Sequence, residues 1–217
     1  MTRAPIFDTI KAARNGASFT QAEVARIDAL LDSLSVPMNA VIGNPISKIV
    51  AKFGKLSPEQ EAGTLAILKA SEGMSASYIA YMLATAWHET NRTMQPVREA
   101  YWLSEEWRRK NLRYYPHYGR GYVQITWPAN YEKADRELNL DGALLRDLDL
   151  AMQPGIAAKI MRLGMVEGWF TGKKLSDYLP AAKGTNAQFV QCRRIINGTD
   201  KAQAIADYAM SFQEALL

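Results

Sequence analysis

The stretch Tyr118-Gly119-Arg120-Gly121-Tyr122-Val123-Gln124-Ile125-Thr126-Trp127 interrupts a chain whose pattern is otherwise helical nearly throughout. Two of its glycines flank an arginine, and glycine allows a tight turn that brings backbone close to a ligand. The residues from 121 to 127 predict a short hairpin. In a strand, Gln124 and Thr126 would point to the same face, because side chains alternate with a period of two. We therefore expect one small β element set in a helical domain.

Helix signals lie on both sides of this stretch. Ser57-Pro58-Glu59 is typical of a helix start, with serine as the cap and proline in the first turn. Helices are expected over about 58–70, 75–88, 129–138, 154–167, 187–196 and 201–216. Thr20 and Glu23 have capping-box spacing and predict one more helix near the N-terminus, whereas residues 37–55 are expected to be a linker or short irregular elements. The fold class is therefore mainly α, or α+β.

Composition and charge suit a folded domain with a small appendage. The 217 residues are 48% hydrophobic and 22% charged, which is enough to bury a core. The net charge of +4 allows an anionic partner without demanding one. Residues 1–55 carry seven basic and four acidic residues, so they hold +3 of this charge. We expect residues 1–55 to form a helical N-terminal appendage or linker, and 56–217 to form the main domain.

The residue counts exclude several classes of protein. Cys192 is the one cysteine, so the chain can form neither an internal disulfide nor a multi-cysteine zinc site. Two histidines, His88 and His117, are too few for a histidine-rich metal centre. The most apolar run, 76–87, is shorter than the roughly 20 residues that span a bilayer. With no signal-peptide pattern at the N-terminus, we expect a protein made in a cytoplasm without stable membrane insertion.

Glu89 is the first candidate for chemistry. It follows the strongly apolar run 78–87, so its carboxyl group is expected where core meets surface. Partial desolvation favours the protonated form of such a group, which makes it a usable general acid. The alternative is a solvated acidic residue at a helix end. A zinc-protease motif is excluded, because Arg92 stands where the second histidine of HExxH would be.

A second carboxyl group is needed for glycoside hydrolysis, in which one acid is protonated and the other ionised. Glu99 lies in the aromatic loop 96–102, of the kind that lines sugar-binding clefts. Glu105 and Glu106 are followed by basic residues and have the pattern of ordinary surface charge. Spacing alone leaves all three open.

The order of these motifs resembles glycoside hydrolase family 19, which contains chitinases and phage endolysins. His88-Glu89-Thr90 comes first, the Tyr-Gly-Arg-Gly-x-x-Gln-x-Thr-Trp-x-x-Asn-Tyr block over 118–131 follows, and Ile195-Ile196-Asn197-Gly198 comes last. The stretch 164–175 is similar to prophage-encoded members. The resemblance covers about residues 57–217. It implies a mainly α, lysozyme-like fold of the α+β type, with one small β-hairpin beside the active-site cleft.

The resemblance also implies roles for individual residues. Glu89 matches the general acid, Glu99 the second carboxylate of endolysin-like members, and Thr126 the residue that helps to hold the attacking water. The residues expected to bind substrate are His88, Tyr118, Arg120, Gln124, Trp127, Asn130 and Asn197. The reaction expected is an inverting hydrolysis that requires no metal and no organic cofactor.

Two positions depart from the chitinase pattern. Asn91-Arg92 stand where chitinases have Gly-Gly, and no arginine follows Arg194, although chitinases carry one well after the Ile-Ile-Asn-Gly motif. These departures predict a cleft rearranged relative to a chitinase. We therefore expect a lysozyme-type, or muramidase-type, endolysin that cleaves the β-1,4 glycan of peptidoglycan.

An endolysin of this kind implies partners and a location. Before release it would stay in the cytoplasm of a phage-infected or lysogenic bacterial cell, and a holin-type pore would admit it to the periplasmic cell wall. We expect a monomer that binds peptidoglycan polysaccharide and no nucleic acid. Two alternatives remain. One is a chitinase acting on β-1,4-linked N-acetylglucosamine polymers. The other is a non-enzymatic binder of glycan or nucleic acid, which would use the basic and tyrosine-rich stretch 108–120.

Overall fold

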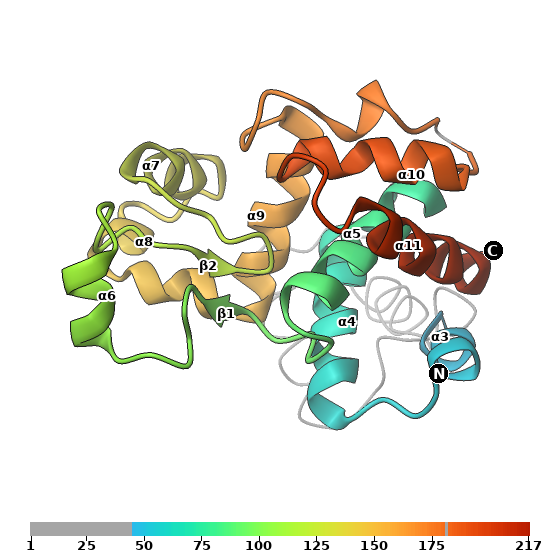
Figure 1. Ribbon diagram of the computed structural model, residues 1–217, viewed down its shortest axis with the longest axis horizontal. Coiled ribbons are helices and arrows are strands. Elements are labelled where there is room, and N and C mark those ends of the chain that lie inside the picture. The colour runs from blue at the N-terminus through green and yellow to red at the C-terminus, as the bar shows by residue number, and fades with distance from the viewer. Residues whose placement is uncertain (1–44, 181) are drawn as a thin grey trace, which may run out of the picture. The chain divides into compact units, whose positions relative to one another are not determined.

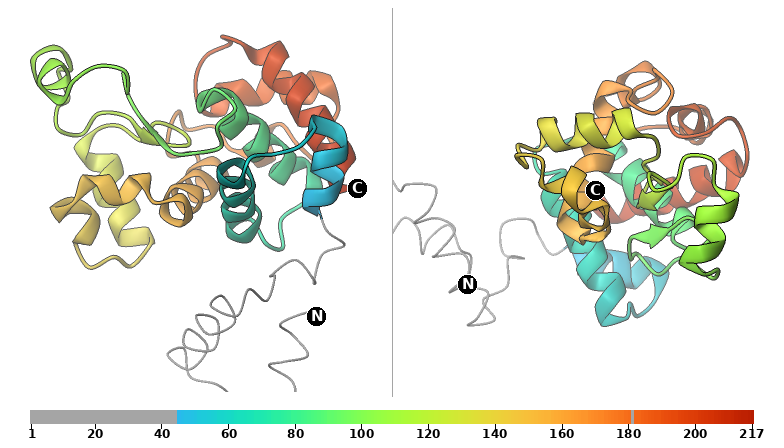
Figure 2. Two further views of the ribbon diagram at one scale, coloured as in Figure 1. Left: turned by 90° about the horizontal axis from the view of Figure 1, so that it is seen from below. Right: turned by 90° about the vertical axis from the view of Figure 1, so that its left-hand side faces the viewer.

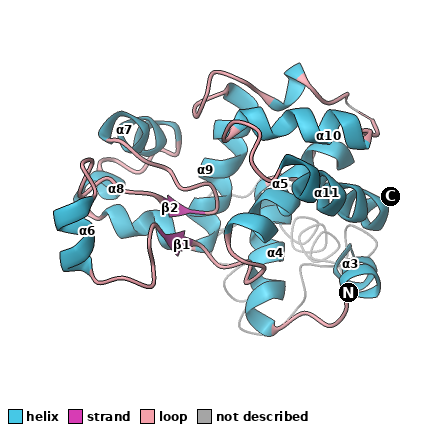
Figure 3. Cartoon of the chain, viewed as in Figure 1, coloured by secondary structure: helices cyan, strands magenta, loops and turns pink. Residues whose placement is uncertain are grey.

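A computed structural model describes residues 45–180 and 182–217 of the chain (Figure 1). The helices are α3 (Pro45–Phe53), α4 (Pro58–Ala70), α5 (Ala76–Glu89), α6 (Glu105–Asn111), α7 (Pro128–Glu137), α8 (Ala143–Arg146), α9 (Pro154–Glu167), α10 (Asn186–Cys192) and α11 (Ala202–Leu216). Short 3-10 helices are η2 (Leu148–Met152), η3 (Leu175–Asp177) and η4 (Arg193–Ile195), and the strands are β1 (Val97–Arg98) and β2 (Arg120–Gly121). Figure 3 shows how strongly helix dominates, so the mainly α prediction is confirmed. The helix predicted around Thr20 and Glu23 lies outside the described residues.

Helix α4 begins where its sequence signal predicts. The side chain of Ser57 accepts a hydrogen bond from the Gln60 N–H at 3.2 Å. The Gln60 side-chain oxygen in turn accepts one from the Ser57 N–H at 2.7 Å. This reciprocal pair is a capping box, and Pro58 in the first turn adds a preset backbone angle. The bounds of α9 also match the prediction, whereas the region 187–196 divides into α10 and η4.

Helix α5 lies in the core and carries the candidate acid at its end. Ala80, Tyr81 and the other residues of its central turns are fully buried. Helices α4 and α11 pack against it (Figure 2). At its C-terminal part, Trp87 packs edge-on to Phe212 of α11, with ring centroids 6.1 Å apart. Burial of the helix up to this point leaves Glu89, its last residue, at the boundary of the core.

Helix α3 corrects the prediction of a linker or irregular elements over 37–55. The sequence Asn44-Pro45 suggests a break in the chain, but Pro45 is the first residue of the helix, a position that suits proline. Phe53 at its end stacks on Phe212 with ring centroids 4.2 Å apart, and Lys52 forms an ion pair with Glu214. The domain boundary near residue 55 stays a prediction, because residues 1–44 lie outside the described part of the chain.

The small β element is present, but its strands differ from those expected. Strand β1 pairs antiparallel with β2, with Val97 opposite Gly121. The hairpin predicted over 121–127 begins one residue earlier, as a tight turn closed by an antiparallel bridge between Arg120 and Ile125, and 122–127 form no strand. The backbone φ angles of Gly121 (86°) and Gln124 (54°) are left-handed, and they turn the chain away from an extended path. The expectation that Gln124 and Thr126 share a strand face is therefore wrong.

Helix α6 lies in a region where the sequence pattern predicts no helix. Ser104 caps it, accepting a hydrogen bond from the Trp107 N–H at 3.1 Å. The helix is only seven residues long, so its sequence holds too few periodic positions to predict it. Within residues 45–180 and 182–217, none of the helices has the length and apolar character needed to cross a bilayer.

Helix α4 approaches the segment that follows α5 so closely that one position admits only glycine. A β-carbon built on Gly63 would lie 1.8 Å from the carbonyl oxygen of Met94. We expect Gly63→Ala to lower the free energy of unfolding by about 3 kcal/mol, because backbone has to move. Gly155 in α9 has open space around it, so Gly155→Ala is the matched control and should be neutral or stabilising by up to about 1 kcal/mol. Urea unfolding of both variants checks this, and equal midpoints would contradict it.

Candidate active site

The carboxyl group of Glu89 is held by a buried arginine. Arg193 Nη1 donates a hydrogen bond to Glu89 Oε1 at 2.6 Å, and its Nε donates to the Asp200 carbonyl at 3.0 Å. The Arg193 side chain is 4% exposed and that of Glu89 is 21% exposed. Within the described residues, Glu89 Oε2 has no hydrogen-bond partner. One carboxyl oxygen is therefore oriented by a cation, and the other is available to a ligand.

The chain turns sharply after Glu89, at the two positions that depart from the family 19 pattern. Asn91 and Arg92 have φ angles of 48° and 68°. The Arg92 N–H donates to the Trp87 carbonyl at 2.7 Å, and the Arg92 guanidinium donates to the Tyr208 hydroxyl at 3.1 Å. Left-handed backbone of this kind suits glycine best. A Gly-Gly pair would adopt these backbone angles without strain, whereas this chain has asparagine and arginine at the two positions.

Glu99 follows β1 directly and has both of its oxygens engaged. Oε1 accepts a hydrogen bond from the Tyr114 hydroxyl at 2.7 Å, and Oε2 accepts one from the Gly119 N–H at 2.9 Å. Burial, together with the hydrogen bond to Glu99, raises the pKa of Tyr114 to about 12, so this phenol stays protonated and donating near neutral pH. These two hydrogen bonds fix the orientation of the Glu99 carboxyl group.

Tyr114, which donates to Glu99, also contacts the exposed side chain of Trp127. The ring of Trp127 meets that of Tyr114 nearly edge-on, with centroids 4.9 Å apart. The guanidinium carbon of Arg113 lies 5.2 Å from the centre of the same Trp127 ring. Trp127 is exposed, so the structure brings one predicted substrate-binding residue to the Glu99 side of the site in a position to meet solvent.

Three more predicted residues are half-buried: Gln124 lies in the turn closed at Ile125, Thr126 follows that turn, and Asn130 lies in α7. Gln124 Nε2 donates to the carbonyl oxygens of Val97 and Gly121, at 2.9 and 3.2 Å. Thr126 Oγ1 donates to the Gln124 carbonyl at 2.8 Å, and Asn130 Nδ2 donates to the Thr126 carbonyl at 2.8 Å. The Thr126 hydroxyl has its proton engaged and keeps its lone pairs for a water. The Gln124 amide holds the turn against β1, and the Asn130 amide holds the backbone just before α7.

Tyr118 and Arg120 were predicted to bind substrate, but the structure buries both. Arg120 Nη1 donates to the Tyr131 hydroxyl at 3.0 Å, and its Nε donates to Asp149 at 2.8 Å. The Tyr118 hydroxyl donates to Glu105 at 3.0 Å. These contacts hold the turn together from inside. The placement favours a supporting role over direct contact with a glycan.

Asp149 links the turn to β1 and predicts a pH dependence of stability. Its carboxylate pairs with Arg98 at 2.6 Å and with Arg120 at 2.8 Å. Burial disfavours its charge, but these hydrogen bonds outweigh burial and leave the pKa of Asp149 below its ordinary value. The resulting stability is present above the unfolded-state pKa of about 4 and is lost as pH falls through the lower folded-state pKa.

The test is the Asp149→Asn variant, which cannot carry the charge. We expect it to be less stable than the wild type at about pH 6, with the difference shrinking by about pH 2.5. Urea midpoints of the two proteins at both pH values measure this. A difference that stays constant over this range would show that the ion pairs of Asp149 do not stabilise the fold.

His88 and Asn197 lie on the Glu89 side. His88 is half-buried, and burial lowers its pKa, assisted by Arg193 and opposed by Glu89, so the imidazole is neutral near pH 7. Asn197 is exposed, and its Oδ1 accepts a hydrogen bond from the Gly198 N–H at 2.8 Å. Its backbone N–H donates to the Arg193 carbonyl at 2.9 Å, which ties this predicted residue to the arginine that holds Glu89.

The predicted residues therefore form two groups. His88, Glu89 and Asn197 gather around Arg193, while Glu99, Gln124, Thr126, Trp127 and Asn130 follow the turn beside β1 and β2. In the part of the chain that the structure describes, no hydrogen bond or ion pair links Glu89 with Glu99. The other acidic candidates have partners on α6, since Glu105 pairs with Arg108 and Glu106 with Lys110.

Arg193 is a site residue that the sequence pattern does not reveal. It stands two positions before Ile195 of the Ile-Ile-Asn-Gly motif, and the fold brings it to Glu89 from 104 positions away. Cys192 beside it is buried, which raises its thiol pKa to about 12 and disfavours a nucleophilic role.

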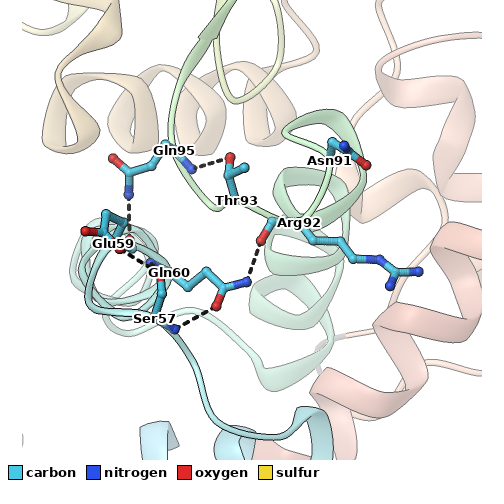
Figure 4. Close-up of a pocket in the computed structure, with 7 residues that line it drawn as sticks. All are labelled: Ser57, Glu59, Gln60, Asn91, Arg92, Thr93 and Gln95. Carbon is cyan, nitrogen blue, oxygen red and sulfur yellow. Dashed lines mark hydrogen bonds between the residues drawn. The ribbon is translucent and has the colours of Figure 1, made fainter.

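An open pocket lies between the start of α4 and the segment that follows α5 (Figure 4). Its volume is about 540 Å³, and its walls are Ser57, Glu59 and Gln60 of the α4 start and Asn91, Arg92, Thr93 and Gln95. Neither Glu89 nor Glu99 lines it, so it is separate from the two carboxyl groups. Residues 45–180 and 182–217 hold no group of three or more histidine, cysteine or acidic side chains placed to bind a metal.

Comparisons with known proteins agree with this architecture. Chitinase C from Streptomyces griseus HUT6037 superposes with a TM-score of 0.54 at 21% identity, over 78% of this chain and 75% of that one. A mutant of chitinase C gives 0.55 at 19% identity, over 78% and 90%. A bacterial family 19 chitinase gives 0.48 at 21% identity, over 78% and 93%. No protein-family model and no curated protein sequence matches the chain. The first two likenesses show that the chain has a chitinase-like, mainly helical fold.

Proposed function

We propose that this protein hydrolyses a β-1,4-linked glycan, with Glu89 as general acid and Glu99 as general base. The observation that carries the proposal is the contrast between the two carboxyl groups. Glu99 accepts hydrogen bonds at both oxygens, whereas Glu89 keeps Oε2 without a partner among the described residues. A chitinase-like fold adds support, because the two chitinase C structures share it.

The proposed reaction follows from this contrast. Glu89 Oε2 is the oxygen that carries the transferable proton, since Oε1 faces Arg193. Glu89 gives this proton to the glycosidic oxygen as the bond to the anomeric carbon breaks. Glu99 takes a proton from a water, which attacks the anomeric carbon from the opposite face, and the Thr126 hydroxyl helps to hold that water. A one-step inverting route of this kind requires carboxyl groups about 6.5–9.5 Å apart.

Peptidoglycan is the substrate that we propose first. The support is the resemblance to phage endolysins and the replacement of Gly-Gly by Asn91-Arg92 directly after the acid. In this account the protein acts as a lysozyme-type endolysin and reaches the periplasmic wall from the cytoplasm through a holin-type pore. It would act as a monomer and would need no cofactor.

Chitin is the second candidate, and the fold likeness to chitinase C favours it. Both substrates are β-1,4 glycans, so the same two carboxyl groups would serve either. The difference would lie in how the walls around the reacting bond accept the lactyl and peptide groups of peptidoglycan.

The test compares reducing ends released from purified peptidoglycan and from chitin by the full chain. Mass spectrometry of the peptidoglycan fragments identifies the bond cut. New reducing ends on muramic acid would support the muramidase proposal, whereas release from chitin alone would establish the second candidate. Release from neither would contradict glycan hydrolysis.

A further inference from the structure

Two large aromatic side chains project from the turn directly after Glu99. Tyr101 is 58% exposed and Trp102 is 71% exposed. Their rings meet edge to face, with centroids 5.2 Å apart. Single exposed apolar residues are ordinary, but adjoining exposed aromatic rings mark a surface that binds something.

A buried arginine holds this turn in shape. Arg108 Nη1 donates to the carbonyl oxygens of Ala100 at 2.8 Å and Leu103 at 2.9 Å, and lies 3.5 Å from that of Glu99. Arg108 Nε is in turn held by Glu105 at 2.8 Å. The backbone on both sides of the two aromatic residues is therefore fixed from below. A turn held in this way loses little backbone freedom when a ligand binds.

The same turn is continuous with the candidate base. Glu99 is bound through its carboxylate to Tyr114 and Gly119, and its N–H donates to the Gly119 carbonyl at 2.7 Å. Only Ala100, with a left-handed φ of 49°, separates Glu99 from Tyr101. A ligand seated on the aromatic pair would thus lie on an extension of the site that contains Glu99.

The charges nearby favour a neutral ligand over an anionic one. In α6 beside the turn, Arg108 pairs with Glu105 and Lys110 pairs with Glu106. These pairs leave exposed Arg109 as the one further basic residue of α6, which is little positive charge for a phosphate-rich ligand. A pyranose ring offers a flat C–H face to an aromatic ring and keeps its hydroxyl groups in water.

We propose that Tyr101 and Trp102 form a platform that binds sugar rings of the glycan chain beyond the bond being cut. This inference rests on the proposed function, because it assigns a further binding site to the same substrate. The platform accounts for two exposed aromatic residues and for the buried arginine beneath them. It makes long glycan chains better ligands than short ones.

Binding is measured in a Glu89→Gln background, so that hydrolysis does not remove the ligand. The protein is sedimented with insoluble peptidoglycan and, separately, with chitin. We expect Trp102→Ala to weaken binding to the glycan substrate about tenfold and Trp102→Phe to retain most of it. Trp107→Ala is the matched control, since Trp107 is also exposed but its backbone lies outside the Arg108 contacts, and its binding should equal that of the parent.

Two further measurements separate this inference from the proposed function. With Glu89 present, Trp102→Ala should raise KM for long glycan chains and leave kcat for short oligosaccharides unchanged. Unchanged sedimentation of Trp102→Ala would overturn the platform even if the protein is an active hydrolase. Normal glycan binding that depends on Trp102, in a protein without hydrolase activity, would support the platform and contradict the proposed function. The same variant is also sedimented with vesicles of anionic phospholipid. If Trp102→Ala weakens binding to these vesicles and leaves binding to both glycans unchanged, the platform is a membrane contact and the glycan proposal is overturned.

Discussion

Replacing Glu89 by glutamine is expected to lower kcat for glycan hydrolysis by about 1,000-fold. Glutamine has the same shape and can still accept the Arg193 hydrogen bond, which Glu89 accepts at 2.6 Å. It cannot give a proton to the leaving oxygen, and a general acid contributes about 10²–10⁴-fold to such a rate. Initial rates of reducing-end release, at saturating substrate, measure the loss.

The matched control for this change is Glu106→Gln. Glu106 is exposed on α6, where it pairs with Lys110, and its neutralisation should leave kcat within about twofold of the wild type. Both variants should unfold within a few degrees of the parent. Full activity of the Glu89→Gln protein would remove Glu89 from the mechanism. Equal losses in both variants would point to a general effect of charge.

Replacing Glu99 by glutamine is the second large effect, with an expected loss in kcat of about 100-fold or more. Its amide oxygen can still accept the Gly119 N–H, and its amide nitrogen can donate to the Tyr114 hydroxyl, so the turn keeps its contacts. What disappears is the ability to take a proton from the attacking water. Binding of an intact glycan chain should remain close to that of the wild type.

The Tyr114→Phe variant measures how much the orientation of the Glu99 carboxyl group contributes to kcat. It keeps the Glu99 carboxylate but removes the hydrogen bond at Oε1, so we expect a loss of about tenfold, smaller than that of Glu99→Gln. A variant at Glu105 that lost more activity than Glu99→Gln would reassign the second carboxylate to α6.

Local signals in the sequence were enough to predict most of the helices. Ser57 and Pro58 predict the start of α4, because a cap and a first-turn proline act over three or four residues. Helix α3 was missed because its stability comes from distant packing of Phe53 on Trp87 and Phe212. The strand pairing of β1 with β2 joins segments more than 20 residues apart, and the pattern around Gly121 does not reveal its partner.

The residues of the candidate site could likewise be predicted from the sequence only in part. Glu89 and Glu99 could be chosen from motif order and from their place beside apolar or aromatic runs. Arg193 lies 104 positions from Glu89, and only folding brings them within 2.6 Å. Tyr118 and Arg120 belong to the most distinctive block of the sequence, yet they are buried supports. A polar motif therefore indicates a functional segment, but it does not predict which of its side chains face the ligand and which are buried.

The most direct test of the two-carboxylate account is the stereochemistry of the first product. Proton NMR during cleavage of a soluble β-1,4 glycan oligosaccharide records the anomer formed before mutarotation. One displacement by a water that Glu99 holds predicts the inverted, α-configured reducing end as the initial product. An initial β-configured product would contradict the account, because it would require a covalent or substrate-assisted step in place of the attacking water.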